Sequence, residues 1–248
     1  MKNIEHRFEV VENRRLTSRT FLMRLRGPEW VIEQPGQFVN LAIEGKYLRR
    51  PISVCDYEGD TVTLLYDTVG EGTSEMSRWA PGYVADILAP LGTGFDPLRG
   101  GDSPLLLGGG IGVAPLYRLA RELKAGGKKP CVILGFNTAA DVVWADEFRA
   151  LGVDTHVATV DGSEGTKGFV TDVEAIHDAA HTYFYACGPL PMLRALCAAL
   201  PVDGELSLEA RMACGFGVCM CCSLETRDGA RRICKDGPVF RKEDLIWK

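Results

Sequence analysis

Four cysteines near the C-terminus have a spacing that is typical of metal ligands. Three of them follow a C-x4-C-x2-C pattern, and the fourth comes after eleven intervening residues: Cys214, Cys219, Cys222 and Cys234. This is the plant-type pattern of a [2Fe–2S] cluster, in which four thiolates hold two irons. Gly215 and Gly217 lie inside the loop, where backbone without Cβ atoms can wrap a cluster closely. We therefore expect a centre that moves one electron at a time.

A zinc site is the alternative for these thiols, because C-x2-C pairs are common in zinc proteins. Zinc sites usually show two such pairs, whereas this chain has a single one followed by a lone partner cysteine. Cys221 lies beside Cys222 and offers a second spacing from Cys219. We interpret Cys221 as a small packing residue, with a ligand exchange left open.

Two elements in the first hundred residues suggest phosphate binding. In Arg50-Pro51-Ile52-Ser53, a guanidinium and a hydroxyl are expected where a strand ends, and a guanidinium can hold a phosphate through two parallel hydrogen bonds. Gly70-Glu71-Gly72-Thr73-Ser74 precedes a short helical pattern, and a helix N-terminus presents free N–H groups to an anion. A surface arginine beside a turn is the alternative for the first element. Together the two elements favour a pyrophosphate site.

Two further motifs follow apolar strands in the middle of the chain. Gly108-Gly109-Gly110-Ile111-Gly112-Val113-Ala114-Pro115 opens a helix, so its glycines allow close approach of a diphosphate, although its spacing differs from G-x-G-x-x-G. Cys187-Gly188-Pro189 ends a late strand, where parallel sheets bind ligands. A tight turn that binds nothing and a cysteine that only packs in the core are the alternatives.

The elements that position these motifs divide into three parts. Residues 1–99 contain short β-rich segments between turns, with one helix expected at Ser74–Trp79, and predict an antiparallel β-barrel. Residues 100–204 alternate strands and helices, including a helix expected at Asp141–Ala150, and predict a parallel α/β sheet. Residues 205–248 form a small cysteine-rich C-terminal domain.

Composition narrows the class of protein. The 248 residues are 46% hydrophobic and 25% charged, with a net charge of −5, which favours neither nucleic acid nor an anionic membrane surface as a partner. The first sixteen residues are charged and lack the apolar core of a secretory signal, and no apolar stretch is long enough to span a bilayer. Nine cysteines without an export signal predict free thiols and a cytoplasmic location.

In this order, the motifs resemble those of the ferredoxin–NADP reductase superfamily. Arg50-Pro51-Ile52-Ser53 and Gly72-Thr73 look like its FAD motifs, and Leu65-Tyr66-Asp67 occupies the strand that lines the flavin. The segment Gly109–Pro115 and Cys187-Gly188-Pro189 look like its nicotinamide nucleotide motifs. With the cysteine-rich segment added, the whole chain resembles the electron-transfer subunit of class 1B dihydroorotate dehydrogenase.

The resemblance implies a relay of cofactors. NADH would pass a hydride to FAD, a [2Fe–2S] cluster would take the electrons singly, and a partner subunit carrying FMN would oxidise dihydroorotate to orotate, in a complex with two copies of each subunit. Cys187 would lie near the nicotinamide without an acid–base role. NAD is favoured over NADP, because the segment after the second sheet strand, residues 135–141, has no Lys or Arg and ends in Asp141.

Two other functions stay open at this point. The first is the small flavin and iron–sulfur subunit of an NADH-dependent ferredoxin:NADP oxidoreductase or of a sulfide dehydrogenase, which would share every motif. The second is a non-enzymatic regulatory module with structural zinc and bound nucleotide. The colour of the purified protein and its bleaching by NADH would separate the redox enzymes from such a module.

Overall fold

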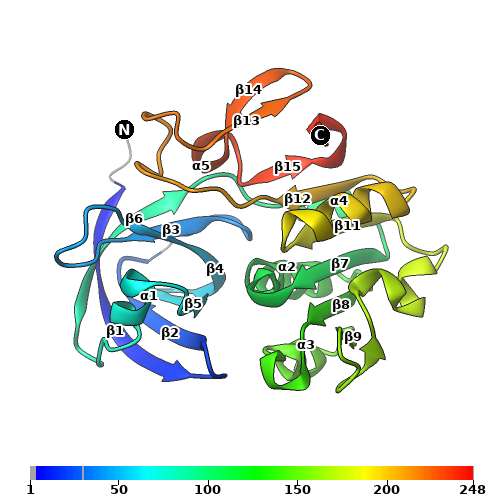
Figure 1. Ribbon diagram of the computed structural model, residues 1–248, viewed down its shortest axis with the longest axis horizontal. Helices are drawn as coiled ribbons and strands as arrows, with labels where there is room; N and C mark the ends of the chain where they lie inside the picture. Colours follow the sequence, from blue (N-terminus) through cyan, green and yellow to red (C-terminus); the bar gives the residue numbers. More distant parts are fainter. Residues whose placement is uncertain (1–3, 30, 248) are drawn as a thin grey trace.

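The computed structural model of the protein describes residues 4–29 and 31–247. A barrel, drawn in blue and cyan in Figure 1, lies beside an α/β sheet drawn in green and yellow. The C-terminal segment, in orange and red, lies across the same end of both. This arrangement places all three parts around one region, where the predicted motifs come together.

Within the described residues, the first part is a closed antiparallel barrel with strand order β1-β2-β5-β4-β3-β6. Alternating buried residues such as Phe8 and Val10 point into its core. One short helix, α1, follows β5. The elements are β1 (Glu5–Arg15), β2 (Thr20–Arg26), β3 (Phe38–Leu41), β4 (Arg50–Glu58), β5 (Thr61–Asp67), α1 (Glu71–Met76), β6 (Val84–Leu91) and the 3-10 turn η1 (Pro97–Gly100).

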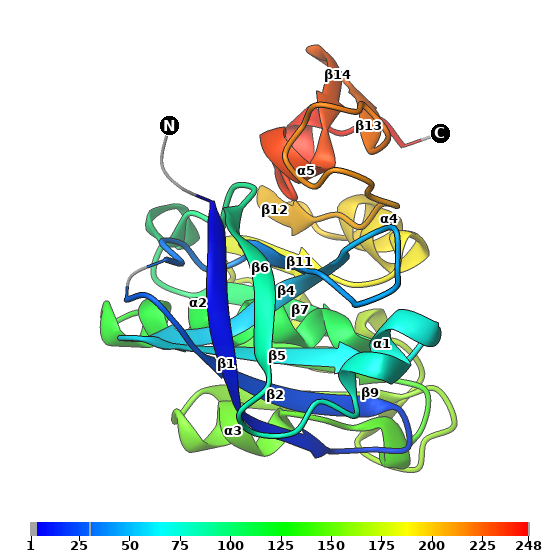
Figure 2. The same cartoon turned by 90° about the vertical axis from the view of Figure 1, so that its left-hand side faces the viewer.

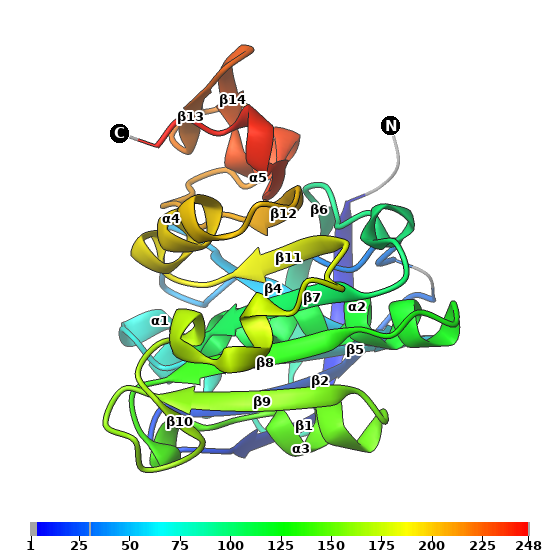
Figure 3. The ribbon, with the colours of Figure 1, turned by 90° about the vertical axis from the view of Figure 1, so that its right-hand side faces the viewer.

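The second part is a sheet of order β10-β9-β8-β7-β11-β12-β15, parallel except at β15. Figure 3 looks onto this sheet. Helices α2 and α3 pack on one face, and α4 packs on the other with η4 and η5. The elements are β7 (Pro104–Gly109), η2 (Gly110–Val113), α2 (Ala114–Ala125), β8 (Cys131–Phe136), η3 (Ala139–Asp141), α3 (Ala145–Ala150), β9 (Asp154–Thr159), β10 (Thr166–Lys167), η4 (Val170–Asp172), η5 (Glu174–His177), β11 (Tyr183–Cys187) and α4 (Leu190–Ala199).

The C-terminal segment is anchored to this sheet. Strand β12 pairs in parallel with β11, and β15 pairs antiparallel with β12. Between them the chain leaves the sheet and forms the raised cap seen in Figure 2. The elements are β12 (Gly204–Ser207), β13 (Ser223–Thr226), β14 (Gly229–Arg232), α5 (Ile233–Asp236), β15 (Val239–Arg241) and η6 (Lys242–Asp244).

Helix α2 joins the barrel to the sheet. Arg118 donates to the Tyr57 carbonyl at 2.6 Å and its guanidinium lies 4.2 Å from the centre of the Tyr57 ring. Arg121 pairs with Asp56 at 2.5 Å. Charge-assisted contacts of this kind fix orientation as well as adding energy, so the two parts hold a defined space between them.

The predicted fold class is confirmed: an antiparallel barrel, a parallel α/β sheet and a cysteine-bearing C-terminal region are all present. Two helices start at positions other than those predicted. The helix expected at Ser74–Trp79 is α1, which begins at Glu71. The helix expected at Asp141–Ala150 begins only at Ala145, because Trp144 has a φ of 66° and cannot continue a right-handed helix.

The domain limits 1–99, 100–204 and 205–248 stay predictions, and residues 1 and 248 lie outside the described residues. Among the residues that the structure describes, no helix has the length and apolar character needed to cross a membrane.

Candidate functional site

A cavity of about 380 Å³ lies where the barrel, the sheet and the C-terminal segment meet. All three parts contribute to its wall, so it exists only in the assembled fold. Most of the predicted cofactor-binding residues line it: Arg50, Pro51, Ile52, Ser53, Leu65, Tyr66, Asp67, Thr73, Gly112, Pro115 and Cys187.

Arg50 begins a strand instead of ending one, so the expected position of Arg50-Pro51-Ile52-Ser53 was wrong. Strand β4 starts at Arg50, and Ser53 lies opposite Phe38 on β3. Pro51, which lacks an N–H group, is tolerated there because it lies at the beginning of the strand. The four residues therefore lie along the cavity wall.

Gly72 allows Arg50 to lie across the start of α1. A Cβ atom on Gly72 would lie 2.2 Å from Arg50 Nε, which no side chain could occupy without displacing the guanidinium. Thr73 lies in the same turn, and its hydroxyl accepts a hydrogen bond from the Val69 amide at 2.9 Å. Arg50 and the first turn of α1 thus form one continuous polar corner of the cavity.

The strand β5 presents aromatic and acidic groups to the same space. Tyr66 is buried, and its hydroxyl donates to Asn13 Oδ1 at 2.9 Å, which directs the polar end of this side chain away from the cavity. Asp67 accepts a hydrogen bond from Thr20 at 2.6 Å and pairs with Arg19 at 3.2 Å. The ring of Tyr66 is therefore held rigidly, as a flat partner for a planar ligand should be.

A second cleft, of about 450 Å³, opens on the other side of the glycine-rich turn. Gly109, Gly110 and Pro189 line it, whereas Gly112 and Pro115 face the first cavity. Gly188 lines neither; a Cβ atom there would lie 3.1 Å from the Gly109 backbone. The turn predicted to bind a dinucleotide thus separates two cavities and contributes to both.

The second cleft also contains residues that bear on the choice of dinucleotide. Asn137 and Asp141 line it, and Asp141 accepts a hydrogen bond from Thr138 at 3.1 Å. Arg19 reaches the cleft from the barrel, which the sequence could not indicate because Arg19 is distant along the chain. Its pairing with Asp67 links this cleft to the first cavity.

Cys187 lies at the end of β11 and is almost fully buried. Burial raises the pKa of its thiol to about 12; the Glu209 carboxylate adds to this effect, and a hydrogen bond with Ser207 opposes it. The thiol is therefore neutral at pH 7 and can shape the cavity without exchanging a proton.

Several lining residues were not identified from the sequence. They come from β3, from the end of β12 and the segment after it, and from the residue before β15: Phe38, Ser207, Leu208, Glu209, Ala210, Met212 and Pro238. Glu209 stands at the rim, where partial desolvation raises the pKa of its carboxyl group. These residues reach the cavity because the C-terminal segment folds back over it, and no local pattern signals that return.

The four predicted metal-ligating cysteines form two pairs. The Cys234 amide donates to Cys222 Sγ at 3.3 Å, and the two thiols are hydrogen-bonded to each other. Cys214 Sγ accepts from the Val218 amide at 3.3 Å and is hydrogen-bonded to the Cys219 thiol. Although burial opposes it, backbone amides lower the pKa of Cys214 to about 6, which favours the thiolate that a metal needs.

The pairs do not converge on one point. A single tetrahedral zinc, with Zn–S bonds of about 2.3 Å, requires sulfur atoms about 3.8 Å apart. Within the part of the chain that the structure describes, the trio of potential ligands found within 4.8 Å of one another lies elsewhere, at Cys131, Asp154 and His156. Cys221 is exposed, contacts the Arg211 carbonyl at 3.6 Å and stands outside both pairs. Two separate pairs suit two metal ions better than one.

The loop around these thiols has room and donors for a bound group. Gly215 has a φ of 80°, a conformation that side chains disfavour, and a Cβ atom there would lie 2.5 Å from Asn40 Nδ2. Asn40 is buried on β3, and its carboxamide has no hydrogen-bond partner among the described residues. An unsatisfied donor against the ligand loop fits a sulfur-containing group bound there.

Two family models match the chain. Residues 209–246 match the iron-sulfur cluster binding domain of dihydroorotate dehydrogenase B. Residues 106–198 match an oxidoreductase NAD-binding domain. The first range contains all four paired thiols, and the second contains the glycine-rich turn and Cys187.

Among curated proteins, the chain is similar over nearly its whole length to electron transfer subunits of dihydroorotate dehydrogenase B (NAD(+)). The subunit of Fusobacterium nucleatum is 44% identical, covering 95% of this chain and 96% of that protein. The subunit of Bacillus caldolyticus is 43% identical, with 97% and 98% covered.

Solved structures show the same fold. A structure of an NADH-dependent reduced ferredoxin-NADP oxidoreductase matches with a TM-score of 0.86 and 29% identity, covering 97% of this chain and 90% of that one. A ferredoxin NADP+ reductase of Neisseria gonorrhoeae matches with a TM-score of 0.67 and 19% identity, over 78% of this chain and 89% of that one.

Proposed function

Because the chain belongs to the family of electron transfer subunits of dihydroorotate dehydrogenase B (NAD(+)), we propose that it binds FAD in the first cavity and a [2Fe–2S] cluster on its two thiol pairs. It is a subunit of an NAD-dependent oxidoreductase of pyrimidine biosynthesis. It exchanges electrons between NAD(H) and a catalytic subunit that carries FMN, in a cytoplasmic complex with two copies of each subunit.

One observation carries this proposal: a single cavity is lined by the barrel motif, by the nucleotide motif and by the segment that holds the thiols. Met212 precedes Cys214 by two positions, and Pro238 follows Cys234 by four. Both line the cavity. A flavin bound there would be a close neighbour of the cluster loop.

In this scheme, the residues of this chain bind and orient FAD and the nicotinamide. Arg50 and the backbone amides at the start of α1 would hold the pyrophosphate of FAD, as paired anion-binding elements do. The ring of Tyr66 would pack against the cofactor, and the neutral Cys187 would set the approach of the nicotinamide. When bound, FAD exchanges a hydride with NAD(H) and single electrons with a cluster.

The direction of the relay follows from electron balance. Oxidation of dihydroorotate to orotate releases two electrons, and the family takes its name from NAD(+) as acceptor. Electrons therefore travel from the partner subunit through the cluster towards NAD(+), which is the reverse of the order expected from the sequence. NADH added in an assay would drive the same relay backwards.

The thiol pairs favour a [2Fe–2S] cluster over a single zinc ion, with Cys214 and Cys219 on one iron and Cys222 and Cys234 on the other. Asp141 in the second cleft supports NAD over NADP, because a carboxylate repels a 2′-phosphate and can accept from a ribose hydroxyl. Arg19 lies in the same cleft but is paired with Asp67.

The experiment is co-purification with the FMN-containing subunit, followed by assay of NAD(+) reduction by dihydroorotate. The proposal expects NADH formation that requires both subunits. The competing proposal is the activity named for the structure that matches at 29% identity, an NADH-dependent reduced ferredoxin-NADP oxidoreductase. A complex that reduces NADP(+) with ferredoxin, and leaves dihydroorotate unchanged, would overturn the proposal.

A further inference from the structure

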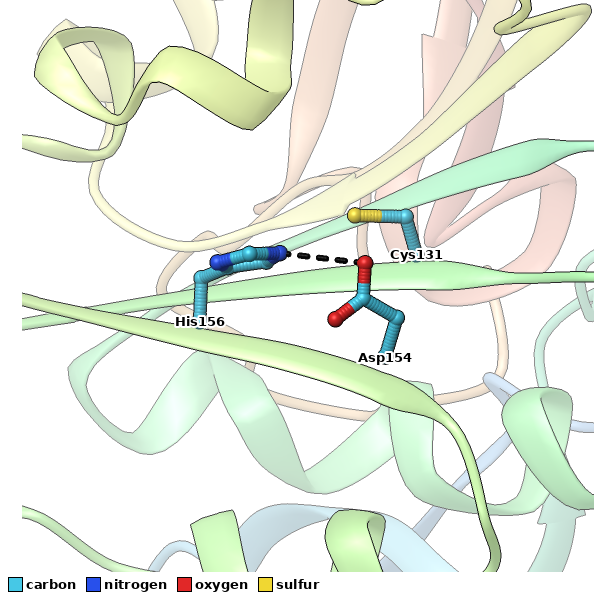
Figure 4. A group of neighbouring side chains, drawn as sticks. All are labelled: Cys131, Asp154 and His156. Atoms are coloured by element: carbon cyan, nitrogen blue, oxygen red, sulfur yellow. Dashed lines mark hydrogen bonds and ion pairs between the residues drawn. The ribbon is translucent and has the colours of Figure 1, made fainter.

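Three side chains that are typical metal ligands meet at the edge of the sheet opposite the nucleotide cleft. The Cys131 sulfur, an Asp154 oxygen and a His156 nitrogen all lie within 4.8 Å of one another (Figure 4). Cys131 and Asp154 begin β8 and β9, whereas the nucleotide cleft lies beyond the carboxyl ends of these strands. The relay uses none of the three.

The register of the sheet brings them together. In the parallel pair β8–β9, Cys131 lies opposite Asp154 and Ile133 lies opposite His156. Residues two apart on a strand point to the same face, so Asp154 and His156 share a face with Cys131. Cys131 is 8% exposed and fixed by the core, while the other two side chains reach solvent. The arrangement is therefore set by two paired strands rather than by a loop.

The distances suit a small cation. His156 Nε2 lies 3.1 Å from Asp154 Oδ2. In a tetrahedral zinc site, with Zn–N of about 2.0–2.1 Å and Zn–O of about 2.0–2.2 Å, a nitrogen and an oxygen ligand are about 3.4 Å apart. One edge of such a tetrahedron is thus nearly in place. The sulfur lies within 4.8 Å of both of these atoms, against about 3.8 Å or less between ligands of a tetrahedral site.

A further nitrogen donor, His181, lies close to part of this group. His181 lines a cavity with two of the three, Cys131 and Asp154, whereas His156 lines another cavity, and His181 is not part of the group within 4.8 Å. Its Nε2 lies 2.8 Å from the Ala175 carbonyl, so Nε2 carries the proton and Nδ1 keeps a lone pair. Nδ1 is buried and has no hydrogen-bond partner among the described residues. Lys124 also lines the cavity, but its ammonium group is bonded to the Gly152 carbonyl at 2.7 Å.

We propose that Cys131, Asp154 and His156 bind a divalent transition metal of the zinc class, with His181 or water as the fourth ligand. Sulfur, nitrogen and carboxylate oxygen together select zinc over magnesium or calcium, which prefer oxygen alone. The ion would tie β8 to β9 and stabilise the nucleotide-binding sheet at the edge away from the redox cofactors. The site is independent of the proposed relay.

The test uses the full-length protein with its cluster loaded and oxidised. Cobalt(II) is added anaerobically, and difference absorption records thiolate-to-cobalt charge transfer. We expect one saturable equivalent, displaced by zinc(II), with affinity at least about tenfold weaker in His156→Gln. The charge-transfer band should be absent in Cys131→Ser and retained in Cys197→Ser, a control thiol that is partly buried and lies outside the proposed site.

His156→Gln keeps the test decisive if Cys131→Ser fails to fold, because the His156 side chain is 36% exposed. Zinc should raise the Tm of the wild-type protein but not that of His156→Gln. Two results would overturn the proposal: no saturable cobalt binding in the wild-type protein, or a charge-transfer band that persists in Cys131→Ser. The second would show that the sulfur comes from another thiol.

Discussion

The walls of the proposed flavin cavity and the loop that carries the thiols are built on different principles. Arg50, Leu65 and Cys187 stand on strands β4, β5 and β11, whose backbones are fixed by ladder hydrogen bonds. The thiol loop at 208–222 contains no helix or strand, and it exposes Phe216, Val218 and Met220. The cavity walls are thus fixed by strand pairing, whereas the loop lacks such pairing and would gain order from the proposed cluster.

This difference predicts that the two regions can be disabled separately. Variants of the thiol loop should interrupt transfer to the partner subunit and leave hydride exchange with NAD(H) intact. Variants of the cavity wall should remove both.

The largest effect is expected for Cys219→Ser. Loss of one ligand should lower cluster occupancy and reduce transfer to the partner subunit by at least about a hundredfold, since even outer-shell changes cost 10–100-fold. Oxidation of NADH by a small dye should persist. Cys221→Ser, which changes the exposed thiol outside both pairs, is the control and should keep its cluster. If dye reduction vanished with FAD still bound, the separation of the two regions would be wrong.

Arg50→Ala tests the cavity wall. Losing a charge-assisted hydrogen bond, worth about 1.5–3 kcal/mol, should weaken FAD binding by about 10- to 100-fold. Quenching of flavin fluorescence on binding measures the Kd. Arg49→Gln is the matched control, because Arg49 pairs with Asp86 at 2.9 Å and does not line the cavity. Equal losses in both variants would contradict the role given to Arg50.

These predictions rest on residues that sequence reasoning could find, because their motifs are contiguous. Arg50 to Ser53 begin strand β4, Gly109 to Pro115 connect β7 to α2, and the C-x4-C-x2-C run lies in one loop. The residue types and spacing within each short motif are enough to indicate which group it could bind. The fold class was accessible for the same reason, since alternation and turn spacing are local signals.

Residues joined only by tertiary structure could not be found this way. Arg19 reaches the proposed nucleotide cleft from the barrel, and Met212 and Pro238 line the proposed flavin cavity from the C-terminal segment. The meeting of Cys131 with His156 depends on the register between β8 and β9. The register between strands and the folding back of the C-terminal segment over the cavity are set by the whole core. No short window of sequence therefore shows them.

Asn40→Leu addresses the contact between the two regions. Its buried carboxamide lies against Gly215, and a donor near the sulfurs stabilises the reduced, more negative cluster. We expect a lower cluster potential, by up to about 59 mV, which corresponds to a tenfold change for one electron. Titration followed by electron paramagnetic resonance measures it. A purely structural role would lower the Tm and leave the potential unchanged.

The smallest effect is expected for Cys187→Ala. Removing a small buried group should reduce kcat/KM for NADH by less than about tenfold. The folded-state pKa of about 12 lies above the ordinary thiol value of 9.0. The neutral thiol therefore contributes stability below pH 9, and this contribution is lost as the pH rises from 9 towards 12. Between pH 6 and 8, the rate profiles of variant and wild type should be parallel. If the pH–rate profile of the wild type had a limb that is absent in Cys187→Ala, the thiol would instead have a proton-transfer role.

The most direct measurement is low-temperature electron paramagnetic resonance of the purified protein reduced by NADH or dithionite, with iron and acid-labile sulfide determined on the same sample. The account predicts two irons and two sulfides per chain and a one-electron signal from a reduced [2Fe–2S] centre. A protein that holds one redox-inactive metal ion on these thiols, without sulfide and without a signal, would contradict it.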